Sequence, residues 1–210
     1  MKWLSIFIFI TPLYFTNANV SSNNAIVNSA ASNNKMEPYK DSLTWIEDFK
    51  LFRTAVFSND MATVKKYFKF PLLNAGNEIW YLVLTEKEYE KRGITGNKGI
   101  VAFKEEDLVK YYKKIFTEPF VKSLLKIKSE ELYKKNTFET PAQYESDYTK
   151  YIMYASYDGE TSILSFNLAY KTVLKNKKGY NEDAGESNVI YNFSVEKDGH
   201  IFFKEIRLAG

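Results

Sequence analysis

The sequence predicts an α+β fold, in which N-terminal helices pack on one face of a curved antiparallel β-sheet. The first half of the chain repeats apolar residues at helical spacing, and the second half alternates apolar and polar residues at strand spacing. Two hairpin turns, Tyr157-Asp158-Gly159 and Lys197-Asp198-Gly199, separate strands in the second half. An aromatic share of 17%, with 16 Tyr and 16 Phe, also favours sheets over a helical bundle.

The first expected helix covers residues 41–57, where apolar side chains fall on a single stripe. Thr44 and Glu47 have the spacing of a capping box, and Asp41 is the alternative start. A short second helix is expected after residues 58–60, which carry turn chemistry.

The next segment is apolar and aromatic but is interrupted. A short edge strand is expected near Pro71, because proline cannot donate to a sheet ladder. Residues 74–77 predict a turn, and the unbroken run 79–84 predicts a second strand. The charged, glycine-punctuated residues 85–99 predict an exposed excursion.

The middle of the chain returns to helical spacing after a short strand at 100–103. One helix is expected over 105–116, and another from Thr117 to about Lys135. Its charged end, KSEELYKK, predicts a solvated surface. Residues 136–147 are polar and contain a proline, so they predict a loop.

The last part of the chain predicts a four-stranded antiparallel meander. A long polar hairpin, residues 174–187, separates its second and third strands. The expected strands are Tyr148–Tyr157, Thr161–Val173, Asn188–Glu196 and His200–Leu208.

The N-terminus has the features of a secretory signal peptide. A positive residue, an apolar stretch and small residues before a cleavage site at Ala18 define residues 1–18. Residues 19–35, rich in Ser and Asn, predict a flexible linker, and residues 36–210 a single domain. The predicted location is the periplasm or the exterior, with no stable membrane anchor after cleavage, because the apolar stretch is short.

Composition narrows the functional classes. Without cysteine, thiolate zinc sites and cysteine nucleophiles are excluded. No metal cluster or cofactor motif is present in the sequence, so we expect neither. After cleavage 28 basic and 26 acidic residues remain, a net charge of +2, which gives no reason to expect a nucleic-acid partner.

Three segments resemble the nuclear transport factor 2-like (cystatin-like cone) superfamily. They are the paired helices ending in NDMATVKKYFKFPL, the strand and helix IVAFKEEDLVKYYKKIF, and the closing strand GHIFFKEIRLAG. The resemblance covers residues 41–210 and implies a sheet curled around a cone-shaped cavity. It also implies a homodimer through the open sheet face. It implies no activity, because the fold hosts enzymes, transport factors and binding modules.

If such a cavity exists, aromatic side chains are its candidate lining. They would form a pocket for a small apolar or aromatic ligand, whereas the alternative is a packed core without a ligand. In an extended run, Trp80 and Tyr81 would point to opposite faces, so at most one of the two would line it. The candidates are Trp80, Tyr81, Tyr154, Phe166, Tyr170, Tyr191 and Phe193.

Enzymes of the superfamily use an Asp, His or Tyr acid–base set, and no matching motif is found here. The only histidine, His200, follows a turn and is expected near a strand end at the surface. Glu205 and Arg207 are expected on the same strand face as Ile201 and Phe203. We therefore expect no catalytic residue.

Three functional hypotheses remain. The first is an exported, non-enzymatic binding protein that engages a small ligand or an envelope protein. The second is an immunity protein that neutralises a toxin in the periplasm. The third is a cofactor-free isomerase or hydratase, which predicts a buried carboxyl or His with a Tyr within hydrogen-bond reach.

Overall fold

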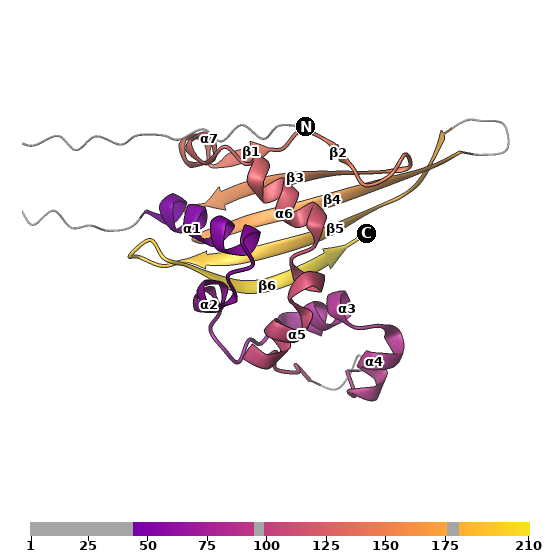
Figure 1. Cartoon of the computed structure of the whole chain (residues 1–210), viewed down its shortest axis with the longest axis horizontal. Coiled ribbons are helices and arrows are strands. Elements are labelled where there is room, and N and C mark those ends of the chain that lie inside the picture. The colour runs from indigo at the N-terminus through magenta and orange to yellow at the C-terminus, as the bar shows by residue number, and fades with distance from the viewer. Residues whose placement is uncertain (1–43, 95–98, 176–180) are drawn as a thin grey trace, which may run out of the picture. The chain divides into compact units, whose positions relative to one another are not determined.

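The computed structural model describes residues 44–94, 99–175 and 181–210 (Figure 1). All of them belong to one compact unit, Lys40–Gly210. Helices come first and an antiparallel sheet follows, so the predicted α+β class is confirmed. The predicted signal peptide, the linker and the alternative helix start at Asp41 lie outside the described residues.

The sheet has the predicted meander at its centre. Its order is β1-β3-β4-β5-β6, β2 also pairs with β3, and every pairing is antiparallel. The tip of the long hairpin, residues 176–180, lies outside the described part. The strands are β1 (Thr137–Glu139), β2 (Gln143–Tyr144), β3 (Thr149–Asp158), β4 (Ile163–Lys175), β5 (Asn181–Val195) and β6 (Ile201–Ala209).

The loop prediction for 136–147 was wrong, because this segment contains β1 and β2. Each strand is two or three residues long, too short for an alternation to show in the sequence. Both pair with β3 and cover one edge of the sheet.

The helical layer lies across one face of the sheet, here called the inner face (Figure 1). The predicted capping box of Thr44 and Glu47 is present at the start of α1. The helices are α1 (Trp45–Phe57), α2 (Met61–Val64), α3 (Glu78–Val83), α4 (Glu86–Lys91), α5 (Glu105–Ile115), α6 (Glu118–Lys126) and α7 (Ser129–Lys135), with 3-10 turns at Lys65–Tyr67 and Ala75–Asn77.

The strand prediction for residues 79–84 was wrong, because this run forms α3. Gly76 and Asn77 both have positive φ, 68° and 60°, and this sharp turn starts the helix. The strands expected around Pro71 and at 100–103 reduce to isolated bridges, one of them between Leu72 and Phe103. Tertiary contacts overrode the strand propensity of the aromatic run.

Two other helical expectations change. The helix expected from Thr117 to Lys135 is divided at Ile127, whose backbone is extended, into α6 and α7. The segment 85–99, expected to be an exposed excursion, contains α4. A second capping box, formed by Thr85 and Glu88, lies at the start of this helix.

A β-bulge corrects the predicted face of two charged residues. Phe193 pairs with Phe203, but Asn192 pairs with Glu205, so β6 has an extra residue between the two pairs. The extra residue reverses the alternation beyond that point. Ile201 and Phe203 are buried on the inner face, whereas Glu205 and Arg207 lie on the outer face.

Aromatic rings fill the space between the helices and the inner face. Phe49 of α1 stacks on Phe166 at 5.1 Å between ring centroids, and Phe52 meets Phe193 at 4.9 Å. The ring centroids of Phe120 on α6 and Tyr191 on β5 lie 4.0 Å apart. Each of these pairs joins a helix to a central strand, so aromatic contacts hold the two layers together.

Side chains of the helical layer close the free edge of β6. Asp48 accepts the N–H of Ile201 at 2.8 Å. Asn74 accepts the N–H of Ile206 at 2.9 Å and donates to its carbonyl at 3.1 Å, as a neighbouring strand would. Glu78 accepts the N–H of Leu208. These bonds satisfy the backbone groups that an edge strand otherwise leaves unpaired.

Replacing Asn74 with Ala tests this edge closure. The buried N–H and carbonyl of Ile206 lose their partners, so the free energy of unfolding is expected to fall by about 3 kcal/mol. Urea denaturation followed by circular dichroism measures the change. The adjacent exposed variant Leu73→Ala is the control and should stay within about 0.5 kcal/mol of the wild type. Equal losses in the two variants would contradict the role of Asn74.

Candidate functional site

The structure does not bring the seven candidate aromatic residues together. Phe166, Tyr191 and Phe193 are buried on the inner face of the sheet. The hydroxyl of Tyr191 donates to the carbonyl of Ile115 at 2.7 Å, and burial raises its pKa. These three side chains belong to the ring layer between helices and sheet. Whether they also line a ligand cavity remains a prediction.

Trp80 is buried elsewhere, on α3. Its ring packs 4.9 Å from Phe103 and 6.2 Å from Tyr111, and its indole N–H donates to the carbonyl of Val101 at 2.9 Å. The Arg92 guanidinium covers the ring at 4.3 Å. All faces of Trp80 are thus occupied by the protein.

The other three candidates are at least partly accessible. Tyr81 is partly exposed beside Tyr89, and Tyr170 is half-buried beside Tyr151. Tyr154 is 43% exposed and points to the outer side of β3. Of the seven, Tyr154 lines the largest surface hollow described below.

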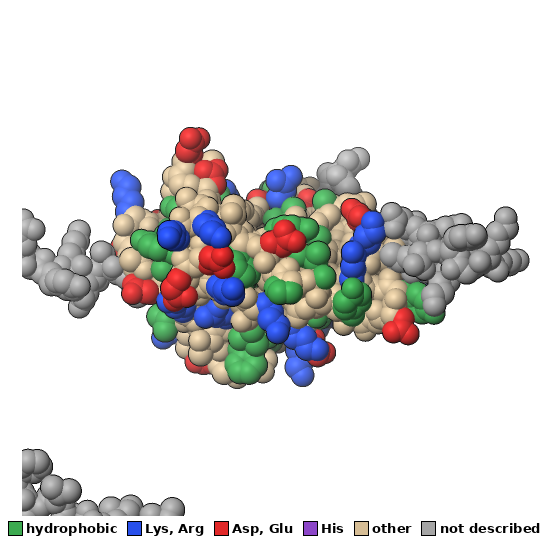
Figure 2. Space-filling model, turned by 90° about the horizontal axis from the view of Figure 1, so that it is seen from above, with side chains coloured by type: hydrophobic (Ala, Val, Ile, Leu, Met, Phe, Trp, Pro, Cys, Tyr) green, Lys and Arg blue, Asp and Glu red, His purple; other side chains and the backbone are tan. Residues whose placement is uncertain are grey.

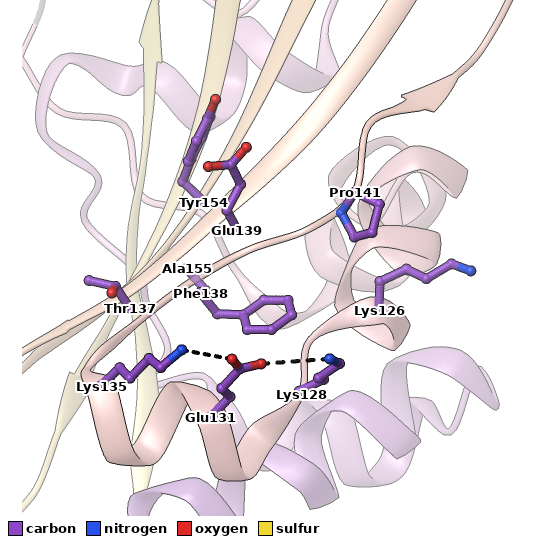
Figure 3. Close-up of a pocket in the computed structure, with 10 residues that line it drawn as sticks. All are labelled: Lys126, Lys128, Glu131, Lys135, Thr137, Phe138, Glu139, Pro141, Tyr154 and Ala155. Carbon is purple, nitrogen blue, oxygen red and sulfur yellow. Dashed lines mark hydrogen bonds and ion pairs between the residues drawn. The ribbon is translucent and has the colours of Figure 1, made fainter.

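This α7–β1 hollow has a volume of about 660 Å³. It lies where the α6–α7 turn and α7 face the edge strand β1, and Figure 3 shows Phe138 between that strand and α7. Its lining residues are Lys126, Lys128, Glu131, Lys135, Thr137, Phe138, Glu139, Pro141, Tyr154 and Ala155.

Three lysines and two glutamates, Glu131 and Glu139, line the hollow, which gives it a net charge of +1. Lys135 and Lys128 lie 2.8 Å and 3.8 Å from the same carboxyl group of Glu131 (Figure 3). The hydrogen bond from Lys135 lowers the pKa of Glu131, which is therefore negatively charged at neutral pH. Lys126 turns away from this carboxyl and has no ion pair within residues 44–94, 99–175 and 181–210. The single carboxylate of Glu131 thus lies beside two ammonium groups, Lys128 and Lys135.

Apolar surface accompanies these charges. Phe138 is half-buried and faces α7, Pro141 follows β1, and Tyr154 borders the hollow from the opposite face of β3. An aromatic wall beside a few ammonium donors is the usual composition of a site for a small ligand with one charged end.

A second cluster surrounds Asp48, whose side chain is 5% exposed. The hydroxyl of Tyr67 donates to its Oδ1 at 3.2 Å, and the N–H of Ile201 to its Oδ2 at 2.8 Å. Burial, followed by the charge of Asp48, raises the pKa of Tyr67, so this hydroxyl stays a donor. Nδ1 of His200 lies 3.6 Å from Oδ2, an ion pair only when the imidazole is protonated.

The three side chains share a hollow of about 460 Å³ between α1, α2 and the start of β6. His200 lies near the strand end at the surface, as expected, and its side chain is 51% exposed. The imidazole approaches Asp48 with Nδ1, and Nε2 does not take part in this contact. The cluster can act as an acid–base pair, but Asp48 also has a structural role at the edge of β6.

Sequence reasoning missed both sites for different reasons. Asp48 and His200 are separated by most of the chain, and no local motif connects them. Two lysines of the α7–β1 hollow, Lys128 and Lys135, belong to the run 128–135, which predicts a solvated helix end. Both lysines are indeed exposed, and their position opposite Phe138 depends on the unpredicted strand β1.

The described residues on the face seen in Figure 2 form no large region of a single charge. Figure 2 shows acidic and basic side chains interspersed on one face, with apolar side chains between them. Long-range attraction therefore contributes little, and selection of a ligand depends on the local geometry of a hollow.

The described residues contain neither a metal-ligand cluster nor a membrane-spanning helix. No group of three or more His, Asp or Glu side chains is placed there to hold a metal ion. Among the helices of the described residues, none has both the length and the apolar character needed to cross a membrane.

Comparison with known proteins found similar solved structures only. No family model matches the chain, and the search of curated proteins found no match. A proposed ketosteroid isomerase from Shewanella frigidimarina is 10% identical, with a TM-score of 0.28, over 80% of this chain and 98% of that one. The beta subunit of a proposed aromatic-ring-hydroxylating dioxygenase from Novosphingobium aromaticivorans is 12% identical, with a TM-score of 0.27, over 77% and 84%.

These similarities carry no argument about activity. The arrangement that the resemblance to the nuclear transport factor 2-like superfamily implied, helices followed by an antiparallel meander, is confirmed by the structure itself.

Two variants separate the structural role of Asp48 from that of His200. Asp48→Asn places an amide donor or a weaker acceptor against the Ile201 N–H and the Tyr67 hydroxyl, so the unfolding free energy is expected to fall by about 3 kcal/mol. His200→Gln changes an exposed side chain and should cost less than about 0.5 kcal/mol. Urea denaturation measures both. A larger loss for His200→Gln would contradict this assignment.

Proposed function

We propose that the protein is an exported, non-enzymatic binding protein that takes a small aromatic carboxylate in the α7–β1 hollow. The observation that carries the proposal is the meeting of Phe138 with three lysines around a volume of about 660 Å³. This volume is within the range of small-molecule sites.

The charge of the ligand follows from the ion pairs. Lys128 and Lys135 share Glu131, and each ammonium group has three donors. A carboxylate would take up the donors that Glu131 leaves unused, while an aromatic body would lie against Phe138.

Binding of 1-naphthoate to the mature chain, measured by isothermal titration calorimetry, tests this proposal. Phe138→Leu, which keeps the side chain apolar, should weaken binding about tenfold, or about 1.4 kcal/mol, through the loss of ring contact. Tyr144→Ala, an exposed tyrosine on β2 outside the hollow, is the control and should bind as the wild type does. Absence of 1-naphthoate binding, or equal binding by Phe138→Leu, would contradict the proposal.

Export is the second part of the proposal and rests on residues 1–18. Intact-mass analysis of the protein recovered from the periplasm or medium of an expressing bacterium is expected to show a chain that starts at Asn19. A chain retaining Met1 and confined to the cytoplasm would contradict export.

The outer face of the sheet is the proposed surface for a homodimer. Polar side chains meet at its centre, where Ser165 donates to Asn192 and Asn192 donates to Glu205, and the buried Oδ1 of Asn167 has no partner among the described residues. Light scattering after size exclusion should give twice the monomer mass, and Ile190→Lys on this face should give the monomer mass. A monomeric wild type at high micromolar concentration would contradict the dimer.

A cofactor-free isomerase or hydratase is the second candidate. The specific observation that favours it is the buried carboxyl of Asp48 within 3.2 Å of the Tyr67 hydroxyl, with His200 beside it. Proton exchange at the α-carbon of a small unsaturated ketone, followed by NMR in heavy water, is the assay. Exchange that His200→Gln abolishes would support this candidate. Exchange equal in wild type and variant would contradict it.

A further inference from the structure

A third hollow, distinct from both sites, lies between the end of α1, the end of α5 and α6. This α1–α6 groove has a volume of about 490 Å³. The residues that matter for its chemistry are Phe57, Lys113, Phe116, Val121, Lys122 and Leu125.

The floor of the groove offers no free polar group to a ligand. Phe116 and Val56 are almost completely buried there. The carbonyl of Val56 accepts the hydroxyl of Tyr112 at 3.1 Å. Burial raises the pKa of Tyr112 to about 12, so this donor keeps its proton at neutral pH. The floor is therefore apolar and internally satisfied.

The walls of the groove are apolar side chains that the fold leaves in water. Phe57 is 58% exposed at the end of α1, and Leu125 is 44% exposed on α6. Half-buried Val121 continues the strip one turn away from Leu125. The groove therefore has an apolar wall that is open to a ligand from solvent.

The rim carries one uncompensated positive charge. Lys122 is paired with Glu118 at 2.6 Å. Lys113 of α5, by contrast, has no ion pair within the part of the chain that the structure describes. The groove thus combines an apolar strip with one available ammonium group.

The strip is too small for a protein partner. Phe57 and Leu125 together expose on the order of 200 Å² of side chain. A standard protein–protein interface needs about 800 Å² on each partner. A narrow apolar strip with a cation at its rim matches the shape and charge of a single alkyl chain with an anionic head.

We propose that the α1–α6 groove binds a free long-chain carboxylate. Its alkyl chain lies along Phe57, Val121 and Leu125, and its carboxylate pairs with Lys113. The site is separate from the α7–β1 hollow and does not depend on the function proposed for that hollow.

Titration of the ¹⁵N-labelled mature chain with dodecanoate below its micelle concentration tests the proposal by NMR. Shifts are expected at residues 56–59, 113–116 and 121–125. Lys113→Glu and Phe57→Ser should each weaken the affinity at least fivefold. Both positions are exposed, so these variants are expected to fold. Leu73→Ser, an exposed apolar residue outside the groove, is the matched control and should bind as the wild type does.

The probes separate this ligand from its alternatives. Dodecyltrimethylammonium, with the same chain and the opposite charge, should bind at least tenfold more weakly than dodecanoate. Equal affinity for the two probes would overturn the role of Lys113. Sedimentation with phosphatidylglycerol vesicles without binding of dodecanoate would assign the groove to a membrane surface and overturn the proposal. Phe138→Leu should leave dodecanoate binding unchanged, which distinguishes this site from the 1-naphthoate site.

Discussion

Closure of the free edge of β6 is the constraint on which the rest of the structure depends. Asp48, Asn74 and Glu78 come from separate helices or turns, and their side chains bind backbone groups spread along one strand. A sheet edge left open would expose unpaired N–H and carbonyl groups and invite pairing with another chain. Here the same bonds align the helical layer with the sheet, which brings the aromatic rings of both layers into contact.

The aromatic filling determines where a ligand can bind. Phe49, Phe120, Phe166 and Tyr191 pack between the helices and the inner face of the sheet. The hollows described here therefore lie at the borders between elements. The α7–β1 hollow exists because α6 and α7 separate at Ile127 and because β1 faces them. Its position at an edge of the sheet leaves it open to a ligand without any change of the core.

The central strands were predictable because their alternation extends over many residues and Gly199 marks a tight turn with positive φ. The helix at Trp80 was not predictable. Strand propensity carries no information about the positive φ at Asn77, where this helix starts. The face of Glu205 depends on a single bulge, which no pattern reveals. The proximity of Asp48 and His200 is a property of the tertiary structure alone.

Amide hydrogen exchange tests the edge closure most directly, because it reports the opening of individual backbone groups. If side chains close this edge, the amides of Ile201 and Ile206 exchange only with global unfolding, with the same free energy as amides of central β4. Exchange of these two amides through local opening, several kcal/mol below the global value, would contradict the account.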